Sequence, residues 1–126
     1  MTPDDDDPVE RLYYSVIGAF FEDYNALGCG LFEHLYMAAL EIELIARGHR
    51  VRREVPVSVF YKGHDLGVQR LDMLVDDTLV VEGKSTEVLT RGASRQVYNY
   101  LGATRLQHGL LLHFGSEARF FRYGRR

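Results

Sequence analysis

The sequence predicts an α/β fold, because the period of its apolar residues changes three times along the 126-residue chain. Apolar residues recur at helical spacing up to Gly48 and then alternate with polar residues as far as Lys84. Helical spacing returns from Arg91, and alternation returns from His108. Clusters of glycine and aspartate separate several of these segments. The expected order is therefore two helices, three strands, one helix and two strands.

The first part of the chain predicts two helices. Four aspartates and Pro8 precede the first one, and proline is favoured in the first helical turn. We interpret residues 1–7 as an acidic disordered leader and residues 9–27 as an amphipathic helix that ends at a pair of glycines. A second helix is expected over residues 31–46. Its predicted buried stripe comprises Leu31, Leu35, Ala38, Ala39, Ile42 and Ile45.

The rest of the chain predicts five strands and one further helix. The strands are expected over residues 50–61, 68–75, 79–84, 108–114 and 118–123, and the helix over residues 91–103. A chain of this length fits one compact unit and leaves no room for a second. Residues 8–126 are therefore expected to form a single domain.

Composition narrows the class of protein. Apolar residues make up 46% of the chain, which is enough for a buried core. The one cysteine, Cys29, excludes an intrachain disulfide and favours a reduced, cytoplasmic compartment. No apolar run approaches the roughly 18 residues of a membrane span, and the acidic N-terminus does not resemble a signal peptide. A membrane partner is therefore not expected.

Charge is divided unevenly along the chain. Residues 1–46 hold ten acidic and one basic side chain, a net charge of −9, whereas residues 84–126 hold eight basic and two acidic ones, a net charge of +6. Residues 47–83 hold six of each, so the total of −3 hides a basic C-terminal part. That part permits a phosphate-binding surface. An uneven spread of solvated charges in a short chain explains the pattern equally well.

Residues 71–84 carry the strongest indication of chemistry. The odd positions of the two strands predicted there are large and apolar, whereas the even positions include Asp72, Glu82 and Lys84. Successive side chains of a strand point to opposite faces, so the odd face is expected in the core and the even face presents two carboxylates and an ammonium together. A three-residue loop at residues 76–78 preserves this parity and sets Asp72 opposite Glu82, with Cβ atoms about 5 Å apart.

Two facing carboxylates repel each other unless a cation lies between them. Oxygen ligands bind Mg²⁺ at about 2.1 Å, so one ion fits between Asp72 and Glu82. A metal ion polarises a phosphoryl oxygen and lowers the pKa of a bound water, while Lys84 could position that water or help to deprotonate it. This arrangement suits phosphodiester hydrolysis. The alternative is a cluster of charged side chains on a solvated sheet face.

The spacing of these residues also resembles a known pattern. Asp72 is followed ten residues later by Glu82-Gly83-Lys84, on consecutive predicted strands after a helix, which resembles the PD-(D/E)XK nuclease superfamily. The likeness runs over residues 28–123. It implies a restriction-endonuclease-like αβββαβ core, a mixed sheet flanked by helices, here with an extra N-terminal helix. Gly83 departs from the bulky residue that would pack better, and marks either a close helix approach or a weakened strand.

Two shorter motifs extend the likeness. Gly30, Glu33 and Tyr36 match the G-x-x-E-x-x-Y signature of one small bacterial family within that superfamily. Gln96 and Tyr100 match a Q-x-x-x-Y element that is familiar from RecB-like exonucleases. Residues four apart share one face of a helix, so both side chains could face the same site.

The resemblance implies a site, a cofactor and an activity. Asp72, Glu82 and Glu33 would hold Mg²⁺ or Mn²⁺, and Lys84 would orient the attacking water. The matched glutamine and tyrosine would support the substrate or the site geometry. The implied activity is hydrolysis of phosphodiester bonds, with DNA as the leading substrate and an exonuclease as one form. The alternative is a catalytically inactive module that binds nucleic acid or assists protein assembly, and RNA, single strands and internal cutting also stay open.

Two surfaces are candidates for partners. Four arginines are expected to contact phosphates in a salt-sensitive way, unless they are merely solvated: Arg91, Arg95, Arg119 and Arg122. Aromatic residues occupy more than one side of the first helix: Tyr13, Tyr14, Phe20 and Phe21. An amphipathic helix buries one stripe, so the remaining aromatics predict a homo-oligomer contact through this helix.

Overall fold

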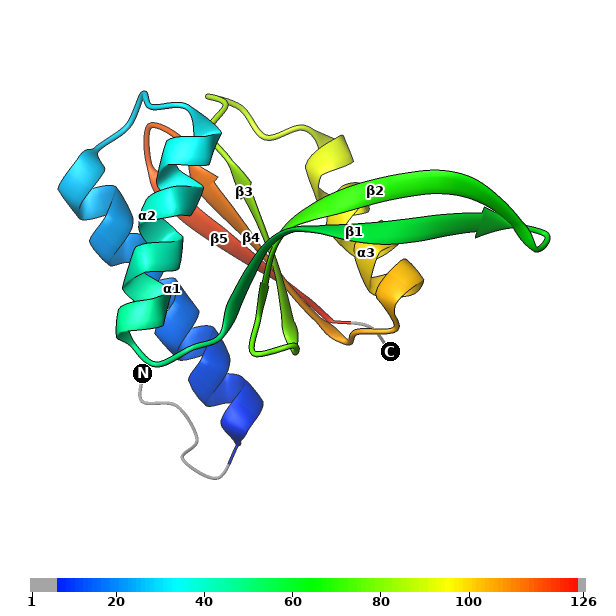
Figure 1. The fold of residues 1–126 in the computed structure, drawn as a ribbon. Helices are drawn as coiled ribbons and strands as arrows, with labels where there is room; N and C mark the ends of the chain where they lie inside the picture. The colour runs from blue at the N-terminus through cyan, green and yellow to red at the C-terminus, as the bar shows by residue number, and fades with distance from the viewer. Residues whose placement is uncertain (1–6, 125–126) are drawn as a thin grey trace.

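A computed structural model describes residues 7–124 of the chain (Figure 1). Its elements are α1 (Pro8–Leu27), α2 (Glu33–Ala46), β1 (Val51–Tyr61), β2 (His64–Val75), β3 (Leu79–Lys84), α3 (Arg91–Thr104), β4 (His108–Phe114) and β5 (Ala118–Gly124). The predicted order of elements is confirmed. Residues 1–6 of the predicted leader lie outside the described residues. Within the described range, none of the helices combines the length and the apolar character needed to cross a membrane.

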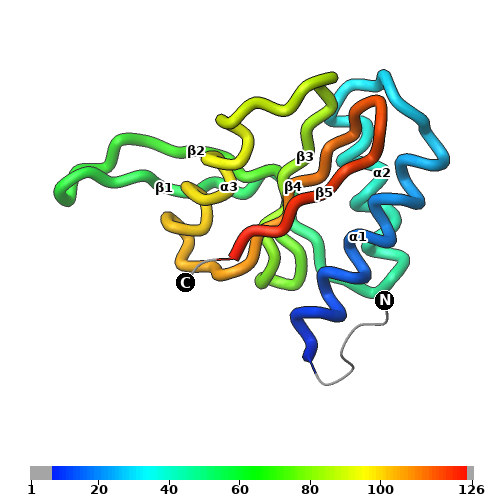
Figure 2. Tube along the Cα trace, turned by 180° about the vertical axis from the view of Figure 1, so that it is seen from behind, coloured from blue at the N-terminus to red at the C-terminus, as the bar shows by residue number. Residues whose placement is uncertain are grey.

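The five strands form one mixed sheet in the order β1-β2-β3-β4-β5. β3 and β4 run parallel and are connected through α3, whereas the other neighbouring strands run antiparallel. α1 and α2 cover one face of the sheet, and α3 covers the other (Figures 1 and 2). Each face has its own buried cluster, one around Phe20 and Leu40 and the other around Val97 and Leu111. The predicted α/β fold with helices on both faces of a mixed sheet is confirmed.

The start of α1 follows from its sequence. Asp7 caps the helix by accepting a hydrogen bond from the Val9 amide at 2.9 Å, and Pro8 occupies the first helical turn. The helix ends where Gly28 adopts a φ of 74°, a backbone conformation that favours glycine. Both ends lie within one residue of the prediction.

The buried face of α2 differs from the predicted stripe. Leu35, Ile42 and Ile45 are exposed, and the predicted stripe is wrong at these positions. The buried residues of the helix are Tyr36, Met37, Leu40 and Leu44. Apolar residues occupy most of the circumference of α2, so helical periodicity alone could not select the face that packs on the sheet.

Gly83 explains why α2 presents Met37 to the sheet. A Cβ atom added at Gly83 would lie 2.5 Å from Met37 Sδ and 3.5 Å from Phe114 Cε2. Glycine therefore leaves the space on β3 that the Met37 side chain fills. Of the two readings of Gly83, the close approach of a helix is confirmed.

β1 and β2 form a long ribbon of which one end extends away from the rest of the sheet (Figures 1 and 2). β2 begins at His64, four residues earlier than predicted, and pairs with β1 up to the turn at Tyr61↔His64. β3 pairs with β2 only over residues 73–75. Beyond that point, no other strand among residues 7–124 pairs with the ribbon on the β3 side. We call residues 58–70 the arm, in which Val59 is half-buried and every other residue is exposed.

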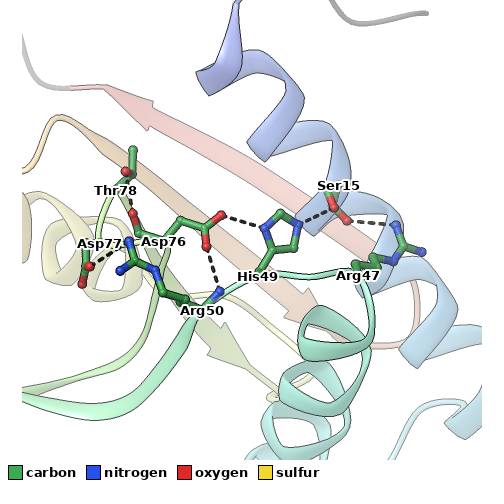
Figure 3. Close-up of polar contacts among 7 residues, drawn as sticks. All are labelled: Ser15, Arg47, His49, Arg50, Asp76, Asp77 and Thr78. Atoms are coloured by element: carbon green, nitrogen blue, oxygen red, sulfur yellow. Dashed lines mark hydrogen bonds and ion pairs between the residues drawn. The ribbon is translucent and has the colours of Figure 1, made fainter.

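Three polar side chains link α1, the segment before β1 and the turn between β2 and β3 (Figure 3). Asp76 Oδ2 lies 2.7 Å from His49 Nδ1, and Ser15 Oγ lies 2.7 Å from His49 Nε2. A carboxylate only accepts, so Nδ1 donates to Asp76, and Nε2 on the other side of the ring forms the hydrogen bond with the Ser15 hydroxyl. The Arg50 amide also donates to Asp76 Oδ1 at 2.8 Å. This Ser15–His49–Asp76 link anchors the β2–β3 turn to the helical layer.

The order serine, histidine, aspartate is also that of a nucleophile triad. Ser15, however, lies inside α1, where the surrounding amides bond to carbonyls of the same helix. Such a serine has no neighbouring amides directed at an oxyanion, which is the feature that acyl transfer requires. We interpret the link as structural.

Candidate functional site

The turn between β2 and β3 sets the register of the candidate site. Val75 pairs with Leu79 and Met73 pairs with Val81, as the three-residue loop predicts. Asp76 and Asp77 in this loop have φ of 52° and 53°, in the left-handed region that aspartate tolerates better than most residues. The predicted register is confirmed for these pairs.

Asp72 and Glu82 meet where the two strands separate. The Asp72 amide donates to Glu82 Oε1 at 2.9 Å, and the Gly83 amide donates to Asp72 Oδ2 at 3.0 Å. The backbone ladder between β2 and β3 ends at the preceding pair, Met73 with Val81. The two carboxylates therefore replace backbone carbonyls as acceptors at this fork, and they lie side by side.

The predicted single apolar face is wrong at Leu71. Met73 packs with the cluster under α1 and α2, whereas Leu71 packs with the cluster under α3. The side-chain alternation of β2 is thus interrupted at Asp72. On β1, the register places Glu54 opposite Asp72, and Glu54 has a φ of 51°. This left-handed residue breaks the regular ribbon and allows β2 to change face.

Glu82 is fully buried, which excludes the reading of a solvated surface cluster. Burial raises the pKa of Glu82, and the neighbouring Asp72 carboxylate raises it further, whereas the Asp72 amide and Lys84 act in the opposite direction. Glu82 Oε2 has no hydrogen-bond partner among the described residues. A buried carboxyl group in this position requires either a proton or a cation.

Glu33 and Lys84 are the other two charged residues of the candidate site. Glu33 opens α2, and burial raises its pKa, followed in effect by the Asp72 carboxylate, while Lys84 lowers it. Glu33 is thus close enough to the fork for the charges of Asp72 and Lys84 to act on its carboxyl group. Lys84 is half-buried at the end of β3 and lines a cavity of about 240 Å³ together with Gln96 of α3. Other residues lining this cavity are Thr86, Leu89, Thr90, Gly92 and Ala93.

Gln96 and Tyr100 connect α3 to β2 next to the fork. Gln96 Nε2 donates to the Tyr100 hydroxyl at 3.0 Å, and that hydroxyl donates to the Arg70 carbonyl at 2.6 Å. Burial raises the pKa of Tyr100, and so do the charges of Glu82 and Asp72. Hydrogen bonds therefore link Asp72 with Glu82 and Gln96 with Tyr100, and Lys84 shares a cavity with Gln96. The Gln96–Tyr100 pair holds the strand two residues before Asp72.

The four predicted phosphate-binding arginines do not form one group. Arg91 and Arg95 are exposed on α3, the helix that supplies Gln96. Arg119 pairs with Glu117 at 2.8 Å. Arg122 makes a forked ion pair with Glu10 at 2.6 and 2.9 Å and lies 3.7 Å above the Tyr13 ring, so it fastens β5 to α1.

Sequence reasoning did not single out His113. This buried residue of β4 hydrogen-bonds through Nε2 to the Thr86 carbonyl, in the segment that follows Lys84. It thereby supports one wall of the cavity. Nothing in the spacing of the five histidines distinguishes it, because its partner is a backbone carbonyl of a neighbouring loop.

The acidic residues supply the oxygen atoms that suit a divalent cation, but they are not arranged as a preformed metal site. Among residues 7–124, no three His, Cys, Asp or Glu side chains converge as a metal centre would. Asp72 and Glu82 each direct one oxygen to a backbone amide. The unpartnered Glu82 Oε2 and the neighbouring Asp72 are still the hard oxygen donors that Mg²⁺ and Mn²⁺ take.

Comparisons with known proteins agree with this geometry. A family model described as the PD-(D/E)XK nuclease superfamily matches residues 10–123. Among solved structures, one described as "Crystal structure of SSO0001" is similar, with a TM-score of 0.55 and 17% sequence identity. The likeness covers 91% of this chain and 58% of that chain, and at this identity it shows the fold alone. Comparison with curated proteins gives no match.

Proposed function

The chain belongs to the PD-(D/E)XK nuclease superfamily, and we propose that it is a metal-dependent nuclease that hydrolyses phosphodiester bonds in DNA. The observation that supports this most strongly is the state of Glu82. Its carboxyl group is fully buried beside Asp72, and its Oε2 has no hydrogen-bond partner among the described residues. A charged pair of this kind is stable when a cation joins it.

Asp72 and Glu82 would hold the Mg²⁺ or Mn²⁺ ion, with Glu33 as a third ligand directly or through water. Such an ion polarises a phosphoryl oxygen and lowers the pKa of a bound water. Asp72 and Glu82 keep their backbone contacts through one oxygen each, since every carboxylate oxygen has more than one lone pair. The fork of the sheet therefore fixes the positions of both ligands.

Lys84 would orient the attacking water and add positive charge beside the reacting phosphate. It follows Glu82 by two residues on the same face of β3, and its charge opposes the burial and the Asp72 carboxylate, which raise the pKa of Glu33 and of Glu82. Gln96 shares the cavity with Lys84, and with Tyr100 it positions the wall that faces the substrate. Arg91 on the same helix would contact phosphates of the substrate.

A nuclease assay tests this function. Linear duplex, circular duplex and single-stranded DNA and RNA would be incubated with Mg²⁺, with Mn²⁺ and with EDTA. Asp72→Ala and Lys84→Ala are expected to abolish cleavage while circular dichroism shows that the fold persists. Asp77→Asn removes the charge of an exposed acid of the neighbouring turn, keeps a residue that tolerates its left-handed backbone, and is the matched control. Cleavage that is undiminished in both site variants would refute the assignment, and the substrate panel separates end-dependent from internal cutting.

The second candidate is a catalytically inactive module that keeps the fold and binds nucleic acid or assists assembly. It is favoured by the hydrogen bonds that direct Asp72 and Glu82 to backbone amides. Isothermal titration with Mn²⁺ separates the two functions. Absence of any heat of metal binding, together with retained binding of DNA, would favour the inactive module.

We further propose that α1 forms a homo-oligomer contact. Tyr14 and Phe21 are exposed on α1, and Phe21 lies edge-on to Phe120 of β5 with ring centres 6.2 Å apart. Tyr13 and Phe20 on the same helix are buried. Light scattering after size-exclusion chromatography tests the contact, because Tyr14→Ser with Phe21→Ser would convert an oligomer to a monomer.

A further inference from the structure

The arm is exposed beyond both buried clusters (Figures 1 and 2). The last residues of the ribbon that pack with a cluster are Val55, Val57 and Leu71. The large apolar side chains exposed on the arm are Phe60 (62%), Tyr61 (58%), Leu66 and Val68. Such a concentration on a protruding segment indicates an interaction surface.

The charges of the arm favour a polyanion. Its basic residues are Lys62 and Arg70, and its one acid is Asp65. Asp65 accepts a hydrogen bond from the Gly67 amide at 2.9 Å and is thus engaged in the local turn. Lys62 Nζ lies 5.3 Å from the centre of the Tyr61 ring. Aromatic rings that stack on bases, accompanied by cations for phosphates, are the usual means of binding polynucleotides.

The edge of β1 disfavours a second protein strand as the occupant. Pro56 lies in the middle of β1, Glu54 has a φ of 51°, and the pairing with β2 is irregular between Val59 and Phe60. Proline, bulges and irregular backbone at a sheet edge obstruct the addition of another strand. A second copy of this chain would therefore find an interrupted edge.

β2 connects the arm directly to the candidate site. Eight residue steps separate His64, where the strand begins, from Asp72. At roughly 3.3 Å per residue the arm reaches about 26 Å from the fork. Nucleotides along one strand of a duplex are spaced at about 3.4 Å, so this reach corresponds to about seven or eight nucleotides.

We propose that the arm binds the nucleic-acid substrate about seven or eight nucleotides from the bond that is cut. Phe60 and Tyr61 are consecutive strand residues and offer one ring on each face of the arm for stacking on bases, and Lys62 contacts a phosphate. The preferred substrate class is then a polynucleotide long enough to span from the fork to the end of the arm, rather than a short oligonucleotide. This inference rests on the proposed nuclease function.

A binding experiment on the full chain tests the arm separately from catalysis. The test variant is Phe60→Ala with Tyr61→Ala. The matched control is Ile42→Ala with Ile45→Ala, since these α2 side chains are similarly exposed, at 71% and 56%, and lie outside the arm. Fluorescence anisotropy in EDTA would compare labelled single-stranded and duplex DNA of about 20 nucleotides with a probe of about 6 nucleotides. Hydrolysis of bis(4-nitrophenyl) phosphate with Mn²⁺ reports on the chemistry alone.

The arm variant is expected to lose affinity for the long probe by about ten-fold or more, with the short probe, the small diester and the control variant unaffected. A loss below about two-fold, or an equal loss in the control, overturns the inference whether or not the protein is a nuclease. A wild type that leaves linear, circular and single-stranded DNA and RNA uncut with Mg²⁺ and with Mn²⁺, while binding of the long probe still depends on the arm, refutes the nuclease and supports the arm. Dissociation of an oligomer by the arm variant in light scattering would identify a self-contact and overturn the inference.

Discussion

The Asp72 amide donates to Glu82 Oε1 at 2.9 Å, although the backbone ladder between their strands has already ended. In return, Asp72 Oδ2 accepts from the amide that follows Glu82, at 3.0 Å. The same two carboxylates therefore terminate the β2–β3 pairing and supply the oxygen atoms of the candidate site. Because of this double role, the isosteric variant Asp72→Asn removes the charge of the candidate site and leaves an oxygen that can still accept from the Gly83 amide.

Removal of the Asp72 charge is expected to abolish stabilisation by a divalent metal. A ligand that binds only the folded state stabilises it by about 2.7 kcal/mol at 100 times its Kd. Scanning fluorimetry with Mn²⁺ should therefore show a higher Tm for the wild type and for the control Asp77→Asn. Asp72→Asn should show no such rise. A metal-induced rise that persists in Asp72→Asn would contradict the assignment of this ligand.

Gly83→Ala is expected to destabilise the protein by about 1–3 kcal/mol, because the new methyl group enters space that Met37 occupies. The added Cβ would lie 2.5 Å from Met37 Sδ, in a buried environment. Urea unfolding measures the loss. In a Met37→Ala background, Gly83→Ala should cost less than it does in the wild type, because the side chain that occupies this space is gone.

Gly102→Ala is the control for this effect. Gly102 lies in α3, and a Cβ added there meets nothing within 4 Å among the described residues. Alanine should stabilise the helix by about 0.5–1 kcal/mol. A loss of stability in Gly102→Ala as large as that in Gly83→Ala would show that crowding against Met37 is not the cause.

Asp23 in α1 is expected to make the free energy of unfolding decrease as pH rises. Its side chain is 5% exposed, and neither carboxyl oxygen has a hydrogen-bond partner in the described part of the chain. Burial raises its pKa from 3.8 to about 7. Between pH 3.8 and about 7 the folded state keeps the proton on Asp23, whereas the unfolded state loses it. The stability that the protonated form contributes is therefore fully present below pH 3.8, declines between these two pH values and is lost above about pH 7.

Asp23→Asn should therefore stabilise the protein at pH 8, by at most about 4 kcal/mol, and have little effect at pH 4. Chemical unfolding at several pH values measures this difference. Glu22→Gln, at the exposed neighbouring position, is the control and should show no such trend. An effect of Asp23→Asn that is the same at both pH values would exclude titration of this group as its origin.

Asp76 is expected to make the free energy of unfolding decrease as pH falls. Burial acts to raise its pKa, but hydrogen bonds from the Arg50 amide and from His49 outweigh it, so the pKa is lowered. Its contribution to stability is then present above the unfolded value of 3.8 and is lost as pH falls through the lower folded value. The side chain is 33% exposed, so the contribution is limited by solvent screening.

Asp76→Asn should reduce stability by about 1 kcal/mol at neutral pH, and the difference from the wild type should close in acid. Asparagine tolerates the left-handed backbone of this position, so the variant tests the carboxylate itself. Thermal unfolding between neutral and acidic pH measures the difference. Asp77→Asn has the same backbone conformation and is the comparison, which should show a smaller effect.

Local sequence patterns were sufficient for most of the fold. β3 and β4 cover the residues expected for them, because each apolar run is bounded by residues that favour turns. The alternation of apolar residues also predicted Asp72 beside Glu82, and the Val75↔Leu79 pair has the register that this requires. The early start of β2 was missed because residues 64–67 show no apolar alternation and are joined to β1 through the backbone.

Features that depend on distant contacts could not be predicted in this way. The face of α2 is selected by Gly83, which lies 46 residues beyond Met37 in the sequence. The change of face between Leu71 and Met73 depends on the backbone of Glu54 on the neighbouring strand. The sequence predicted that Arg122 contacts phosphate, but in the structure Arg122 forms an ion pair with Glu10 near the other end of the chain.

Asp72 is also the point at which the ribbon leaves the body of the protein. Its amide is held by Glu82, and the Arg70 carbonyl just before it is held by Tyr100. These two hydrogen bonds hold the ribbon where it leaves the sheet. A force on the far end of the arm is therefore resisted by the residues that surround the two carboxylates.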